Sequence, residues 1–310
     1  DEEDFDDEED FDDDEDDAGI DPNLEPGEVV TEFLEAWVDE DYNLAYNYLS
    51  AESSLREGLT EEEWTERREQ WVDITQPDEL RIDFVRERES QKPRIWLPNP
   101  FSQRTSTTQK EIELGWSFEL LDSEWADADP TQGAPLPELP QATTSYEVTG
   151  RQWFWTSYTL VQEENGWRIQ SMTDEGTNAR GLSITELQKR INDHNNQVEK
   201  ITQEHRPTDP DAGIYFDEII WRSTETLFYA DILLTKLPLD QSLYVNAAAR
   251  AITFGDLERG LVYLEQAAEK FSEQRAENLR QIAAIQLQLS EKYAEGEEPL
   301  EDCLLYTSPS

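Results

Sequence analysis

The chain has 310 residues and a formal net charge of -47, together with 10 Trp, 11 Tyr and 11 Phe. So many large aromatic side chains exclude a wholly disordered protein, and the length allows two domains that each bury a core. The negative charge excludes nucleic acid as an expected partner, because its phosphate backbone would be repelled.

The first 22 residues contain 16 Asp or Glu and no Lys or Arg. Such a run repels itself, so we expect residues 1–27 to form a disordered acidic tail and linker. Phe5 and Phe11 are candidate partner contacts within it, although a solvating linker is the favoured interpretation. The basic residues are 18 Arg against 7 Lys, and a Lys-poor acidic surface is also typical of halophilic proteins.

Both ends of the sequence look like fragment ends. The chain begins without Met, and its last eight residues, 303–310, resemble a translated sequencing adaptor, so we expect them not to belong to the fold. An acidic linker before a folded domain often follows a signal peptide or membrane anchor. We therefore expect an extracytoplasmic or cell-surface protein that contacts membrane only through a missing N-terminal anchor; the alternative is a cytoplasmic protein of a halophile.

Helix patterns come first along the chain. Apolar residues at helical spacing predict a helix from Val29 to Val38 and a shorter one through Leu49, with Asp39 to Asp41 as caps between them. Thr60 and Glu63 form a capping box that begins a third helix.

Strand patterns follow the helices. Alternation predicts strands at residues 80–85, 112–120, 146–148, 152–162 and 166–172, with an Asn165-Gly166 turn joining the last two. The strand at 112–120 has one apolar and one wet face. Two long proline-bearing connections, 89–110 and 122–144, are interpreted as disordered or decorative, with function as the alternative.

This order of helices followed by an antiparallel sheet resembles the nuclear-transport-factor-2-like (SnoaL-like) cone fold over residues 28–176. The resemblance implies a curved sheet and a ligand surface in the cone or on the sheet. Enzymes of that family use an Asp or Glu base inside the cone, often beside His or Tyr.

From Ser183 onward the pattern becomes helical. Ser183 and Glu186 form a capping box, and residues 214–237 supply a second apolar helix. Residues 244–272 resemble one tetratricopeptide repeat, with small residues inside the hairpin and Gly255-Asp256 at its turn. The expected fold class is thus α+β, with an all-helical, tetratricopeptide-like domain at residues 183–296 that binds a protein partner.

Catalytic chemistry is not expected. His194 and His205 both fall on the helix that follows the cone, so no His-carboxylate pair is predicted inside it. Asp83 is expected to face solvent because Ile82 and Phe84 look like the buried set. We predict no catalytic residue, no metal and no cofactor, because no ligand spacing or phosphate-binding glycine loop is present.

Two groups of residues are candidate sites. Strand tryptophans usually fill cores, but the alternative is an aromatic pocket for a small apolar or sugar-like ligand, lined by Trp116, Trp153, Trp155 and Trp167. Seven basic residues also gather within a 30-residue window, where strand-edge charge is favoured over a functional patch. They are Arg81, Arg86, Arg88, Lys92, Arg94, Arg104 and Lys110.

The predicted function is therefore non-catalytic binding or scaffolding by a surface-tethered protein. One alternative is a cone-fold enzyme of the isomerase, dehydratase or hydrolase kind, which a carboxylate buried at the cone's centre would favour. The other is a purely structural spacer.

Overall fold

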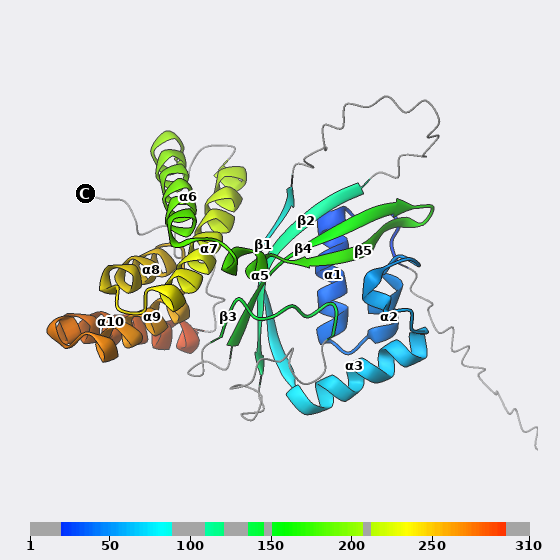
Figure 1. Cartoon of the computed structure of the whole chain (residues 1–310), viewed down its shortest axis with the longest axis horizontal. Coiled ribbons are helices and arrows are strands. Elements are labelled where there is room, and N and C mark those ends of the chain that lie inside the picture. Colours follow the sequence, from blue (N-terminus) through cyan, green and yellow to red (C-terminus); the bar gives the residue numbers. More distant parts are fainter. Residues whose placement is uncertain (1–19, 89–108, 121–135, 146–150, 207–211, 296–310) are drawn as a thin grey trace, which may run out of the picture.

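The structure is a computed structural model that describes residues 20–88, 109–120, 136–145, 151–206 and 212–295. Helices precede an antiparallel sheet, and a second set of helices follows it (Figure 1). This order confirms the α+β class expected from sequence. The last residues, 303–310, and the predicted strand at 146–148 lie outside the described residues.

Three helices open the fold: α1 (Pro26–Val38), α2 (Tyr42–Asn47) and, after a 3-10 turn (Ser54–Arg56), α3 (Glu61–Thr75). The predicted caps are present. The side chain of Asp41 accepts from the backbone N–H of Leu44, and Thr60 and Glu63 cap α3 reciprocally. Residues 20–25, which the sequence placed in the tail, lie against the fold, because Ile20 and Leu24 pack on the first core.

The sheet contains β1 (Pro77–Arg88), β2 (Gln109–Leu120), β3 (Thr144–Ser145), β4 (Arg151–Glu163) and β5 (Gly166–Asp174). All its pairs are antiparallel, in the order β1-β2-β4, and β4 then pairs with β3 at one end and with β5 at the other. The predicted hairpin is confirmed: Glu163 pairs with Gly166, which adopts a φ of 104°.

The C-terminal helices are α5 (Glu175–Arg180), α6 (Ile184–Glu204), α7 (Ala212–Lys236), α8 (Gln241–Thr253), α9 (Leu257–Lys270) and α10 (Arg275–Glu295), with a 3-10 turn (Ser272–Gln274) before α10. Ser183 and Glu186 form the predicted capping box of α6. The predicted hairpin is the pair α8 and α9, whose facing surfaces bury Ala248, Ala251 and Ala267.

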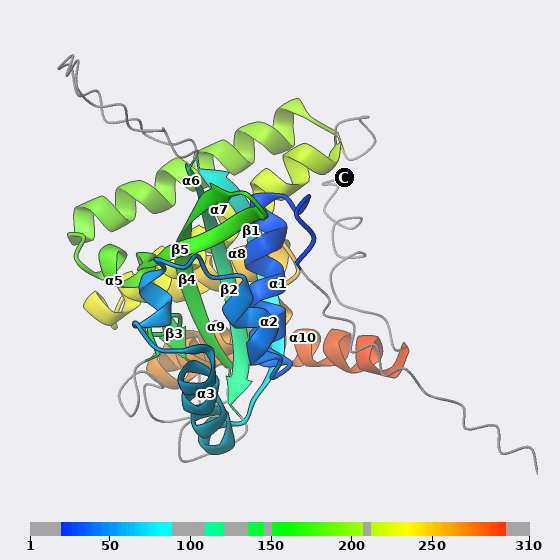
Figure 2. The ribbon, with the colours of Figure 1, turned by 90° about the vertical axis from the view of Figure 1, so that its right-hand side faces the viewer.

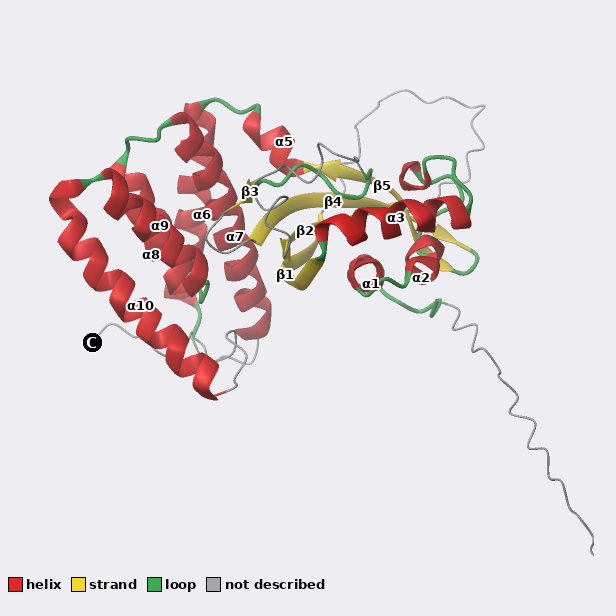
Figure 3. Ribbon diagram, turned by 90° about the horizontal axis from the view of Figure 1, so that it is seen from below, coloured by secondary structure: helices red, strands yellow, loops and turns green. Residues whose placement is uncertain are grey.

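Both faces of the sheet are covered. Figures 2 and 3 show α1, α2 and α3 on one side of the sheet and α6 to α10 on the other. The first side buries alternate residues of β2 and β4, among them Leu114, Trp116 and Phe154. The second side buries Trp153, Trp155 and Phe84 against the helices. The expected wet face of β2 is therefore wrong, since the helical layer formed by α6 to α10 covers it.

A register shift in β1 changes which residues share a face. The shift lies between Ile82 and Phe84, so Ile82 packs on the first core while Phe84 joins the second. A bulge places two successive residues against one partner residue and reverses the alternation beyond it. Arg86 and Arg88 consequently point to the helical layer with Phe84, which simple alternation from Ile82 does not predict.

The connection at 122–144 also contributes to the first core. Leu136, Glu138 and Leu139 are buried there, on the side of the sheet that α3 covers. This described part is structural, in contrast to the decoration that the sequence favoured.

Candidate functional site

The four tryptophans of the predicted pocket lie on both faces of the sheet. Trp116 stacks on Phe154 with ring centroids 4.5 Å apart in the first core, and Trp167 borders the same core. Trp153 and Trp155 face the helical layer instead. The structure does not bring these four side chains together, because residues 116 and 167 and residues 153 and 155 leave the sheet in opposite directions.

The predicted basic patch is not an open positive surface in its described part. Four of its seven residues are described and each pairs with carboxylates: Arg81, Arg86, Arg88 and Lys110. The other three, Lys92, Arg94 and Arg104, lie outside the described residues. The arginines of β1 face the helical layer, so their charges neutralise buried acids.

Glu113 of β2 is the centre of a buried cluster of charges. Its carboxylate accepts hydrogen bonds from Arg88 Nη2 at 2.5 Å and from Trp155 Nε1 at 2.7 Å, and it pairs with Arg86. Burial raises the pKa of Glu113 above its ordinary 4.5, against the opposing effect of the Arg88 hydrogen bond. The sequence placed this side chain on a wet face, but it is fully buried.

A His-carboxylate pair extends this cluster into the helical layer. His194 Nε2 of α6 lies 3.1 Å from Glu225 Oε2 of α7, and Glu225 Oε1 accepts from Arg86 Nη2 at 2.9 Å. The sequence did not predict the pair, because only the packing of α6 on α7 brings the two residues together. None of His194, Glu225 and Glu113 lines the cavities beside α1, α2 and α8.

A second charged cluster joins β1 to α7 and α9. Asp231 accepts from Arg259 Nη2 and from the Tyr263 hydroxyl, both at 2.5 Å. Asp83 accepts from Arg81 Nε at 2.8 Å, and its side chain is only 10% exposed. The expectation that Asp83 faces solvent is therefore wrong. Burial raises its pKa, which Arg81 opposes.

A buried carboxylate also lies in the first core, where the enzyme alternative requires one. Glu138 accepts hydrogen bonds from Arg68 of α3 and from the indole of Trp37. Both of its oxygens are occupied by these donors. The ring of Trp64 lies against the same guanidinium, 3.8 Å from Arg68 Cζ, so the pair is enclosed by aromatic side chains.

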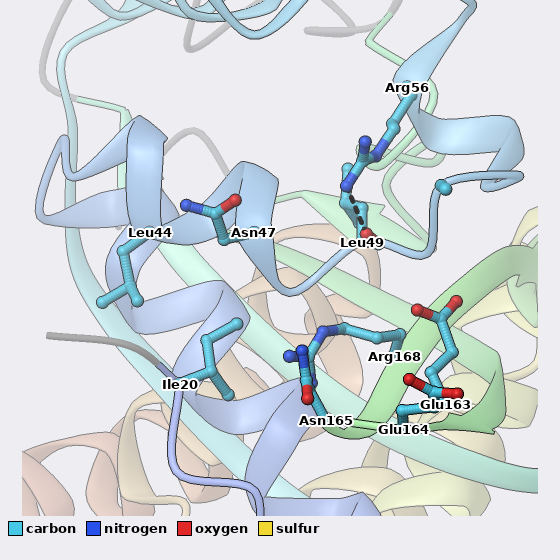
Figure 4. Close-up of a pocket in the computed structure, with 10 residues that line it drawn as sticks. Ile20, Leu44, Asn47, Leu49, Arg56, Glu163, Glu164, Asn165 and Arg168 are labelled. Carbon is cyan, nitrogen blue, oxygen red and sulfur yellow. Dashed lines mark hydrogen bonds between the residues drawn. The ribbon is translucent and has the colours of Figure 1, made fainter. Parts of the chain in front are cut away.

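An open cavity of about 590 Å³ lies between α2, the segment after it and the β4–β5 turn (Figure 4). Backbone hydrogen bonds fix its walls: Ser50 donates to the carbonyl of Ile169 and Ile169 donates to that of Tyr48, both at 2.9 Å. The lining residues include apolar Ile20, Leu44, Leu49 and Ala51, and polar or charged Asn47, Arg56, Glu163, Glu164, Asn165 and Arg168.

Two arginines line this cavity. Arg56 Nη2 donates to the carbonyl of Leu49 at 2.6 Å, and its guanidinium lies 4.0 Å from the ring centroid of Tyr46. Arg168 of β5 donates to the carbonyl of Trp167 at 2.7 Å. Figure 4 shows the two side chains entering the cavity from different walls. No described carboxylate oxygen lies within 4.0 Å of a guanidinium nitrogen of Arg56 or Arg168, so neither arginine forms an ion pair with a described residue.

The electrostatic environment of Arg168 reflects this arrangement. Partial burial lowers its pKa, and the positive charge of Arg56 adds to the effect, while Glu163 and Tyr48 oppose it. An anion placed between the two arginines would relieve their repulsion. No pattern in the sequence predicts this site, since Arg56 and Arg168 are more than a hundred residues apart and neither belongs to a motif.

Comparisons with known proteins assign no family to this chain. The scan against protein-family models found no match to the chain, and the searches of curated proteins and of solved structures found no similar protein. Within the described residues, no cluster of His, Cys, Asp and Glu has the composition of a metal site. No described helix has the length and hydropathy that a membrane span requires.

Proposed function

We propose that this protein is a non-catalytic binding protein, and that the cavity between α2 and the β4–β5 turn takes a small ligand with one anionic group. The observation that carries the proposal is the pair Arg56 and Arg168, which line one open cavity without an ion-paired carboxylate among the described residues. In a chain of net charge -47, most arginines would be expected to find acids.

Guanidinium groups suit this role. Their planar N–H donors match the geometry of carboxylate and phosphate oxygens, and such charge-assisted bonds are stronger than neutral ones. Arg56 is held in place by the carbonyl of Leu49 and the ring of Tyr46, so little side-chain entropy remains to be lost on binding. Arg56 can therefore bind an anion at a smaller entropic cost than a freely rotating arginine side chain would.

The other lining residues restrict the ligand. Glu163 and Glu164 lie on the hairpin side of the cavity and disfavour a second anionic group there. Ile20, Leu44 and Leu49 offer apolar surface for a hydrocarbon portion. The best ligand class is a small amphipathic carboxylate or phosphate monoester, which differs from the apolar or sugar-like ligand of the alternative tryptophan pocket.

The absence of catalysis is part of this proposal. It is supported by Glu138 and Glu113, whose oxygens accept from arginine and tryptophan donors and so are poor bases for a substrate. We further propose that residues 28–176 form a nuclear-transport-factor-2-like cone and that α8 and α9 form a tetratricopeptide-like hairpin. The order of elements and the small residues between α8 and α9 support both assignments.

Isothermal titration with hexanoate and with inorganic phosphate tests the cavity. We expect Arg168→Gln to weaken binding of the better probe about tenfold or more, because a hydrogen bond to a charged group is worth about 1.5–3 kcal/mol. Arg280→Gln is the matched control, since it removes one exposed arginine from α10, far along the chain from the cavity. Equal affinity of the wild type and Arg168→Gln for the probe contradicts the proposal. So does the absence of binding of both probes to a variant whose acidic N-terminal residues are replaced by Asn and Gln, in which the tail no longer repels an anion.

The helical layer supplies a second candidate surface. Leu279 and Leu287 of α10 are 47% and 59% exposed, and a spacing of eight residues places both on one face of the helix. We propose that this face binds a protein partner. A photo-crosslinker at position 287 should then capture a discrete partner under conditions in which one at Lys189, on exposed α6 surface, does not.

A further inference from the structure

The N-terminal acidic run enters the fold at the mouth of the cavity just described. Ile20, the first described residue, lines that cavity. Pro22 lies against the β4–β5 turn, so closely that a Cβ on Gly166 would be 3.0 Å from the Pro22 carbonyl oxygen. Ile20 and Pro22 are therefore held beside the cavity that Arg56 and Arg168 line, and the acidic run directly precedes Ile20 in the sequence.

We propose that the acidic tail, residues 1–19, is an intramolecular competitor that places its carboxylates between Arg56 and Arg168 and regulates ligand binding there. The inference rests on the anion-binding role proposed for the cavity. On this proposal the tail occupies the cavity, whereas a solvating linker would only keep the fold in solution.

Charge and reach both favour this occupant. Fifteen of the first 17 residues are Asp or Glu, and Asp16 and Asp17 lie four and three residues before Ile20. Extended chain spans at most about 3.6 Å per residue, so these carboxylates are within about 14 Å of the cavity mouth along the chain. A tether this short gives an effective concentration on the order of millimolar, which exceeds that of most free ligands.

The described arginines of β1 are poorer targets for the tail. Arg81, Arg86 and Arg88 are ion-paired with acids at the interface between sheet and helices. To bind the tail they would have to give up buried partners, which costs more than an exposed pair returns. Arg56 and Arg168 have no described ion-paired carboxylate to give up, since their described hydrogen bonds go to backbone carbonyls.

Opposing charge keeps the contact weak. Glu163 and Glu164 line the same cavity, and the rest of the chain is also acidic. These acids repel any tail carboxylate that is not close to the two arginines. Such a contact is displaced by a ligand of matched shape and is screened by salt, since the Debye length falls to about 3 Å at 1 M.

Two variants of the 310-residue chain, each with the same change of charge, test the proposal. The proximal variant neutralises the six acids nearest the fold, and the distal variant neutralises six far ones. The proximal set is Asp12, Asp13, Asp14, Glu15, Asp16 and Asp17, and the distal set is Asp1, Glu2, Glu3, Asp4, Asp6 and Asp7, each replaced by Asn or Gln. We expect the proximal variant to bind hexanoate or phosphate about fivefold more tightly than wild type, and the distal variant to change affinity less than twofold. The difference should vanish when Arg168→Gln is added.

Direct proximity provides a second readout that needs no ligand. A spin label at Phe11→Cys, in a chain with Cys303→Ser, should broaden the methyl resonances of Leu44 and Leu49 more strongly at low salt than at high salt, and this salt dependence should disappear in the proximal variant. Equal affinities in the wild type and proximal variant, equal effects of the two neutralisations, or broadening that does not depend on salt each overturn the inference. If Arg168→Gln still weakens probe binding in those cases, the proposed function stands and only the role of the tail is lost.

Discussion

The ring of Phe84 occupies the space that a side chain on Gly115 would need. A Cβ on Gly115 would lie 2.7 Å from Phe84 Cε1 and 3.2 Å from Phe228 Cε2. Gly115 pairs with Phe84 across the β1–β2 register shift, and Phe228 belongs to α7. The missing side chain in the sheet therefore lets the aromatic residues of β1 and α7 close over β2.

Gly115→Ala should destabilise the protein by about 1–3 kcal/mol, the range for overpacking a filled core. Urea unfolding followed by tryptophan fluorescence measures the change. Gly213→Ala is the control, because no atom lies within 4 Å of a Cβ built there and the residue is helical. Its free energy of unfolding should be unchanged or slightly higher. Equal changes in the free energy of unfolding for the two substitutions would show that Phe84 and Phe228 shift at little energetic cost.

Arg68 and Glu138 form a buried two-pronged pair, with Nε to Oε1 at 2.6 Å and Nη2 to Oε2 at 2.7 Å. Arg68→Met should reduce the free energy of unfolding by about 3–5 kcal/mol, because it leaves an unpaired buried carboxylate. The double variant Arg68→Met with Glu138→Leu should recover most of this loss. A double variant no more stable than Arg68→Met would show that the pair contributes by shape and not by charge.

Glu113→Gln should change how stability depends on pH. The folded-state pKa of Glu113 is raised above 4.5, so between 4.5 and that value the folded state binds more protons than the unfolded state. The contribution of Glu113 to stability is then fully present below pH 4.5 and is lost as pH rises through the folded pKa. Arg86, Arg88, Trp155 and Glu225 all face this carboxyl group.

The measurement is the difference in free energy of unfolding between the wild type and Glu113→Gln from pH 4 to pH 8. We expect the wild type to lose stability relative to the variant as pH rises across this range. A flat difference, or one that grows with pH, contradicts the raised pKa. Glu199→Gln, an exposed change on α6, serves as the control for the substitution itself.

Gly166→Ala should disturb the N-terminal entry segment. Gly166 has a φ of 104° and is crowded by Pro22, whereas Gly58 has a φ of 73° and open space around it. Gly58→Ala therefore reports backbone strain alone, about 1 kcal/mol, and Gly166→Ala adds the displacement of Pro22. We expect the second to be the more destabilising by thermal unfolding. Equal losses would mean that Pro22 moves away without cost.

Local chemistry in the sequence determined the elements themselves. Helix starts at Thr60 and Ser183 were predicted because a capping box acts within four residues, and the β4–β5 hairpin because Gly166 accepts a positive φ that other residues avoid. The alternation of β2 was also correct as a pattern. These features depend on neighbours in the chain, so they can be read without the fold.

Tertiary structure decided which surfaces are buried and which charges meet. One register shift in β1 moved Phe84 to the other face, and the packing of α7 on the sheet enclosed Glu113 and brought Glu225 to His194. The cavity likewise joins Arg56 to Arg168 only because the end of α2 hydrogen-bonds to β5 at Ile169. Alternation specifies two faces of a strand but not what covers them, and contacts across more than a hundred residues leave no local pattern in the sequence.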